Sequence, residues 1–223
     1  PELFQEYLDY CILREKSQRE GMLALSRIKW FYPTKMLPLG IFLRKNKDKI
    51  KTILPENENA AKYFATMLTE RKIIVMSREG SYIPIVTLPQ KRNEANFVIE
   101  RIQNLCESGK GMGGRSAFVY LLSEMVDNIY DHAKFSDASI FAQIYKKKGF
   151  SEIVIMDDGI TIPGSYAVAG HAFDDGQALL KALEGLSTKA QERGFGLRTS
   201  VNLFTKGLKG NFLIVSGKAA VYI

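Results

Sequence analysis

The segment Ser123–Ala133, with the sequence SEMVDNIYDHA, decides how the rest of the chain is interpreted. Glu124 and Asn128 are four residues apart, so they project from one side of a helix. His132 continues this row, and Asp131 lies one turn beyond Asn128. Apolar residues recur at the i, i+3, i+4 spacing of a buried helix face: Phe118, Leu121, Leu122, Met125, Val126, Ile129 and Ala133. The segment therefore predicts one continuous helix, whose polar patch is either a solvated face or part of an active site.

A second segment, Ile153–Gly164 with the sequence IVIMDDGITIPG, predicts a buried strand that ends in an acidic turn. A third segment, Arg193–Thr199 with the sequence RGFGLRT, contains a glycine pair that opens a helix predicted from about Leu197 to Phe204. The beginning of a helix presents free backbone N–H groups, which suit phosphate. Because a glycine pair alone is a weak signal, the order and spacing of the three segments carry the interpretation.

The pattern E-x-x-x-N on a helix, then D-x-G at a strand end, then GxGL opening a helix, resembles the GHKL ATPase superfamily over residues 110–223. That superfamily includes gyrase-type topoisomerases, a heat-shock chaperone, histidine kinases and a mismatch-repair protein. Ser123–Ala133 is most similar to the anti-sigma-factor serine kinases, and Asp157–Pro163 to the DDGxGIP turn of gyrase-type proteins. There is one departure, because Thr161 stands where the family usually has a second glycine.

This resemblance implies an α/β fold, in detail a two-layer α+β sandwich with a Bergerat-type mixed sheet that has helices on one face. We expect the ATP-binding domain to span residues 91–223 and a smaller α/β domain, with a sensor or partner-binding role, to span residues 1–90. Strand-like and helical stretches alternate in the first 90 residues, and no catalytic constellation is visible there. The beginning of the chain predicts a helix with a break near Gly21 and a second part from Met22 to Ile28, and Pro38–Leu43 is either a strand or a short buried helix. In the second half we expect a strand at Ala138–Tyr145, a helix at Gln177–Leu183 and a closing hairpin of Asn211–Ser216 and Ala219–Ile223.

The resemblance also implies ATP and Mg²⁺ as ligands. Glu124 would be the catalytic base, and Asn128 would offer an oxygen to Mg²⁺, a hard ion that prefers oxygen ligands. Asp157 would accept a hydrogen bond from the exocyclic amine of adenine and so select ATP over GTP. The other positions at which we expect contact with ATP are Asp131, Gly159, Thr161, Ile162, Lys189, Arg193, Gly194, Gly196 and Leu197. Within this set, Lys189 and Arg193 would belong to a lid that reaches the phosphates.

The leading hypothesis is slow ATP hydrolysis, or phosphate transfer to a serine or threonine of a protein, in regulation and signal transduction. A histidine kinase is disfavoured, because the chain has only two histidines and neither precedes the ATP-binding segments. The alternative is a non-catalytic module that senses ATP or binds a protein, with the basic N-terminal half binding a partner or nucleic acid. The presence of Glu124 argues mildly against that alternative, because binding alone needs no base.

Composition sets the remaining expectations. The 223 residues are 46% hydrophobic and 25% charged, which is typical of a globular protein, and no apolar run reaches the length of a membrane span. The two cysteines have no metal or disulfide spacing, so we expect reduced thiols and a cytoplasmic location. The net charge is +7, densest at Arg44–Lys51, where we favour a solvated loop. We expect a protein partner or phosphoacceptor rather than nucleic acid, and leave a homodimer open.

Overall fold

The computed structural model describes residues 2–68, 81–107, 115–187 and 196–223. Contacts divide the chain into two units. The first comprises Pro1–Thr87 and Ser139–Met156, and the second comprises Leu88–Ala138 and Asp157–Ile223. The chain combines helices with sheets, which confirms the predicted α/β class. The two units interleave along the sequence, and the functional division at residue 90 stays a prediction. Among the described helices, none is long and apolar enough to cross a membrane.

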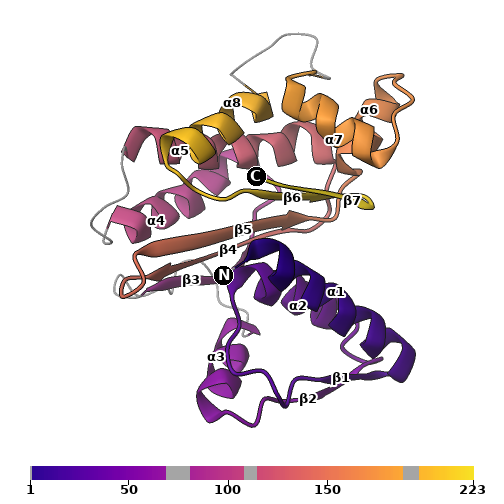
Figure 1. Ribbon diagram of the computed structural model, residues 1–223, viewed down its shortest axis with the longest axis vertical. Helices are drawn as coiled ribbons and strands as arrows, with labels where there is room; N and C mark the ends of the chain where they lie inside the picture. The colour runs from indigo at the N-terminus through magenta and orange to yellow at the C-terminus, as the bar shows by residue number, and fades with distance from the viewer. Residues whose placement is uncertain (1, 69–80, 108–114, 188–195) are drawn as a thin grey trace. The chain divides into compact units, whose positions relative to one another are not determined.

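Helices and short strands build the first unit (Figure 1). Its elements are α1 (Leu3–Glu20), β1 (Met22–Ala24), α2 (Pro33–Lys45), β2 (Lys51–Ile53), α3 (Glu58–Leu68), β3 (Tyr82–Thr87), β4 (Ala138–Tyr145) and β5 (Phe150–Asp157). Strands β1 and β2 pair in parallel, and β4 lies between β3 and β5, antiparallel to β3. The predicted end of the first helix near Gly21 is confirmed, since that residue has a φ of 65°. The helix predicted to continue from Met22 is wrong, because β1 begins there.

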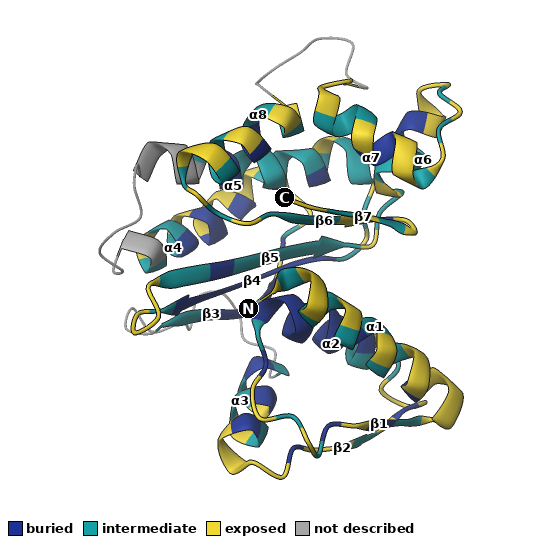
Figure 2. Ribbon diagram, viewed as in Figure 1, coloured by how far each residue is buried: buried dark blue, intermediate teal, exposed yellow. Residues whose placement is uncertain are grey.

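Helix α2 is the centre of the first unit and is buried from Pro33 to Phe42, as Figure 2 shows. The sequence left Pro38–Leu43 open between a strand and a buried helix, and it is helical. The Lys35 ammonium is buried and lies 3.0 Å from carboxylate oxygens of Glu6 and Asp9 on α1. This pairing compensates the charge that the helix carries into the core.

The second unit is mostly helical. Its elements are η2 (a 3-10 helix, Arg92–Ala95), α4 (Asn96–Glu107), α5 (Arg115–Asn128), η3 (a π-helical turn, Ile129–Ala133), α6 (Thr161–Val168), α7 (Asp175–Glu184), α8 (Gly196–Asn202), η4 (a π-helical turn, Leu203–Gly207), β6 (Leu213–Ser216) and β7 (Ala219–Tyr222). Helices α4 and α8 pack against α5, and α7 packs against α6, α8 and β7 (Figure 1). The predicted closing hairpin is confirmed as β6 and β7.

Hydrogen bonds between strands define three separate sheets in the described part of the chain: β1-β2, β3-β4-β5 and β6-β7. One pair is parallel, and both other pairs with a defined register are antiparallel. A single mixed sheet of the Bergerat type, with helices on one face, therefore stays a prediction.

Candidate functional site

Helix α5 presents one buried side and one partly exposed side. Leu121, Leu122 and Val126 are buried, as the spacing predicts. Glu124 and Asn128 are both partly exposed and lie one helical turn apart. Within the described residues, the structure records no hydrogen bond or ion pair for either side chain.

The helix changes its winding after Asn128. Ile129–Ala133 forms a π-helical turn, in which hydrogen bonds span five residues rather than four. The prediction of one continuous helix over Ser123–Ala133 is confirmed, with a change of winding in its last turn. His132 is partly buried and, within the described residues, takes part in an interaction of its own. Asp131 is exposed and takes part in an interaction of its own.

The two aspartates of the acidic turn have different partners. Asp158 accepts hydrogen bonds from the N–H and the hydroxyl of Ser136, both at 2.9 Å, and from the N–H of Asp137 at 2.8 Å. Its carboxylate therefore fixes the segment between η3 and β4. Asp157 accepts the Gly159 N–H at 2.9 Å with one oxygen, and the described residues supply no recorded partner for the other. Burial raises the pKa of Asp157, the Gly159 N–H lowers it, and the Asp158 charge raises it further.

The turn after β5 packs directly on η3. The Ile160 N–H donates to the Ala133 carbonyl oxygen at 2.7 Å. A methyl group built on Gly159 would lie 2.7 Å from the Ala133 Cβ and closer still to its carbonyl oxygen, so the position needs glycine. Thr161, where the sequence resemblance led us to expect a glycine, has a φ of 67°. The backbone therefore adopts the left-handed conformation that glycine favours, although the residue is β-branched.

The described part of the third predicted segment, Gly196–Thr199, lies in a helix that packs against α5. Helix α8 begins at Gly196, which has a φ of 65°, and Leu197 is partly buried within it. Helix α8 packs against α5 and α7. The Ile162 N–H donates to the Ser216 hydroxyl at 2.8 Å, which ties the beginning of α6 to β6. Three predicted phosphate contacts lie outside the described residues: Lys189, Arg193 and Gly194.

Several supporting residues were not predicted from the sequence. Arg92 forms an ion pair with Asp127 on α5, and its guanidinium lies 5.8 Å from the centre of the Tyr130 ring. The Tyr130 hydroxyl donates to the carbonyl of Pro89. These contacts hold the candidate helix against the segment before α4. No local sequence signal marks them, because the partners are about 35 to 41 residues apart.

Chemically, the arrangement offers oxygen ligands and one half-buried carboxylate. In the described residues, no group of three or more His, Cys, Asp or Glu side chains is placed to hold a metal ion. An Mg²⁺ ion here would depend on Asn128 together with phosphate oxygens and water, which fits the ion's preference for few protein ligands. Comparisons with protein-family models, with curated proteins and with solved structures found no significant match.

Proposed function

We propose that the second unit binds ATP with Mg²⁺ in the manner of the GHKL ATPases. One observation carries the proposal: the Asp157 turn packs on the end of the helix that bears Glu124 and Asn128, through Gly159 and Ala133. Two of the three segments that resemble the family are thus in direct contact, and the third, α8, packs on the same helix. The left-handed backbone at Thr161 adds support, because it is the conformation that a family glycine would adopt.

Asp157 is the proposed adenine contact. One of its oxygens is used by Gly159, while the other can accept a hydrogen bond from the exocyclic amine of adenine. A ligand donor would stabilise the ionised carboxylate, whose pKa burial raises. Guanine presents a carbonyl oxygen at this place, so two acceptors would face each other. We therefore expect ATP to be preferred over GTP.

Glu124 is the proposed base, and Asn128 the proposed Mg²⁺ ligand. In hydrolysis, Glu124 would orient a water for attack on the γ-phosphorus; in transfer, it would accept the proton of a protein serine or threonine hydroxyl. Asn128, one turn away, would hold the ion beside the phosphates. Lys189, Arg193 and Gly194 remain proposed phosphate contacts from the sequence resemblance, with Gly196 and Leu197 at the beginning of α8.

Thermal unfolding with nucleotides tests the proposal. Mg-ATP at about 100 times its dissociation constant should stabilise the folded protein by about 2.7 kcal/mol and raise its melting temperature, while Mg-GTP should do so much less. Glu124→Gln should keep this shift and abolish phosphate release in a coupled assay. Absence of any shift with Mg-ATP would refute the proposal. An ATP shift with no turnover in the wild-type chain, with or without a protein substrate, would favour the non-catalytic alternative.

A further inference from the structure

An exposed aromatic side chain in the first unit rests on a second aromatic ring. Trp30 stacks on Tyr63 of α3, with ring centres 4.9 Å apart and an angle of 24° between the planes. The Tyr145 ring lies edge-on to the indole at 6.5 Å. Trp30 is nevertheless 38% exposed. The indole is thus held in one orientation by the rings behind it while part of its surface meets solvent.

A basic turn lies beside these rings. The turn between β4 and β5 carries Lys146, Lys147 and Lys148, all of them exposed. The Lys148 ammonium donates to the Tyr32 hydroxyl at 3.0 Å and lies 5.9 Å from the centre of the Tyr145 ring. The charged turn is therefore anchored beside the aromatic residues rather than pointing away from them.

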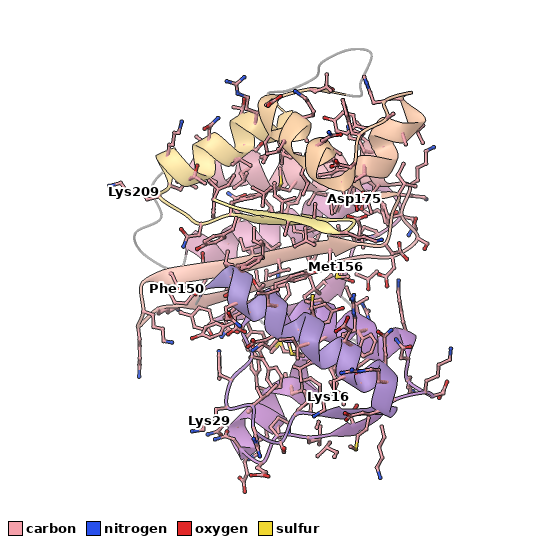
Figure 3. All side chains as sticks on the ribbon, turned by 45° about the vertical axis from the view of Figure 1, so that its right-hand side comes forward. Lys16, Lys29, Phe150, Met156, Asp175 and Lys209 are labelled. Carbon is pink, nitrogen blue, oxygen red and sulfur yellow. The ribbon has the colours of Figure 1, made fainter. Side chains whose placement is uncertain are left out.

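The segment around Trp30 adds further positive charge. Arg27 and Lys29 are both exposed and come shortly before Trp30 in the chain, and Figure 3 labels Lys29 on this segment. Glu56 brings one negative charge next to this segment, because its backbone N–H donates to the Ser26 carbonyl at 3.1 Å. Glu58, exposed in the first turn of α3, adds a second negative charge, so the five basic residues still outnumber the acidic ones. We call the basic residues and the rings together the Trp30 surface: Arg27, Lys29, Trp30, Tyr63, Tyr145, Lys146, Lys147 and Lys148.

We propose that the Trp30 surface binds a single-stranded nucleic acid, with a base stacked on Trp30 and neighbouring phosphates bound by the lysines. Stacking on an aromatic ring accepts any base and needs bases that are not already paired, which excludes a regular duplex. The lysines supply the charge that follows a phosphate backbone. An acidic protein segment would satisfy the lysines but would leave the stacked, exposed indole unused. The assignment differs from the sequence-based expectation, which placed the densest basic charge at Arg44–Lys51 and favoured a protein partner over nucleic acid.

Because the chain contains a single tryptophan, its fluorescence reports this surface alone. In the experiment, the full chain is titrated with oligo(U) and oligo(dT) of twelve nucleotides each while the emission of Trp30 is followed. The affinity is measured separately, from the anisotropy of fluorescein-labelled oligonucleotides. Heparin serves as a polyanion without bases. Both oligonucleotides should quench the emission on binding, whereas heparin should bind without comparable quenching.

Variants test whether the oligonucleotide binds at the Trp30 surface. Trp30→Ala should weaken oligonucleotide binding roughly 5- to 160-fold, the range for the loss of one stacked base, and Trp30→Phe should weaken it less. The triple variant K146A/K147A/K148A should lower the slope of log affinity against log salt by about 2, since each phosphate contact contributes about 0.7. The matched triple variant K47A/K49A/K51A removes three exposed lysines elsewhere and should leave affinity and slope unchanged.

Three results would overturn the proposal: no binding of either oligonucleotide at low salt, binding without quenching of Trp30, or equal losses in the two triple variants. Equal affinity for heparin and oligonucleotide would also overturn it, because charge alone would then explain the interaction. Circular dichroism of each variant separates loss of binding from loss of fold.

Discussion

The backbone N–H of Ile160 donates to the carbonyl oxygen of Ala133 at 2.7 Å, which joins the turn after β5 to the last residue of η3. The two residues are 27 positions apart, with β4 and β5 between them. The same turn carries Asp157, and the same helix carries Glu124 and Asn128. Any ligand that contacts both the helix and the turn depends on this junction.

Replacement of Gly159 tests the junction. Gly159→Ala would place a methyl group 2.7 Å from the Ala133 Cβ. Because backbone atoms must then move, we expect a loss of stability of about 1–3 kcal/mol, together with weaker ATP binding. Urea unfolding measures the first and calorimetry the second. Gly176→Ala, at an exposed helical position with only an ordinary contact at 3.4 Å, is the control and should be neutral or stabilising. Equal stability of both variants would contradict the close packing.

At Thr161 we expect a substitution to raise the stability of the protein rather than lower it. Its φ of 67° is unfavourable for a β-branched residue, so Thr161→Gly should stabilise the protein by up to about 1 kcal/mol. Thr161→Ala is the matched control, because it also loses the hydroxyl that accepts the Gly164 N–H at 3.3 Å but keeps a Cβ. Thermal unfolding should therefore rank glycine above alanine. An alanine variant as stable as the glycine variant would show that the backbone is not strained there.

Asp157 should display a conflict between stability and binding. Burial raises its pKa, so the wild-type protein loses stability as the pH rises from the ordinary value of 3.8 through the higher pKa of the folded state. Asp157→Asn keeps an oxygen for the Gly159 N–H and removes this loss. We expect a higher melting temperature at pH 7, no gain at pH 3, and weaker ATP binding by about 1–3 kcal/mol.

Asp158→Ala is the control within the same turn. It removes the acceptor of three hydrogen bonds from Ser136 and Asp137, so it should lower the melting temperature at pH 7. If Asp157→Asn and Asp158→Ala lowered stability equally, the two aspartates would not have the different environments described above.

Local signals in the sequence predicted several elements closely. The strand Ala138–Tyr145 is confirmed at both ends, and the helix predicted at Gln177–Leu183 lies within α7. Alternating apolar residues, a glycine turn and a capping aspartate are all properties of neighbouring residues, so they can be seen in one segment of sequence. The helix at Thr161–Val168 was missed, because its first turn contains a β-branched pair and a proline, which do not indicate a helix.

Features that depend on distant residues could not be predicted. Strands β1 and β2 have three residues each and exist because they pair with each other across the intervening helix. The π-helical winding of η3 and the partners of Asp158 likewise depend on residues that are close only after folding. For the candidate site, the helix and the acidic turn were identified by resemblance, whereas their contact through Gly159 needed the structure. The site roles themselves stay predictions.

Glu152 gives a final test, in the first unit. Its carboxylate is only 6% exposed and accepts the Thr34 N–H at the beginning of α2 at 2.7 Å. Burial raises its pKa, the Thr34 bond lowers it, and the Glu6 charge raises it, with a net rise above 4.5. Stability should therefore fall as the pH rises through the folded-state pKa. Glu152→Gln keeps the acceptor without the charge and should exceed the wild type in stability at pH 7 but not at pH 4.

Glu152→Ala should lose about 1–3 kcal/mol of stability, since the buried Thr34 N–H is left without a partner. Urea unfolding at both pH values measures these differences, with Glu100→Gln on the exposed side of α4 as the control. A glutamine variant less stable than the wild type at pH 7 would mean that α2 stabilises the ionised carboxylate more than burial opposes it.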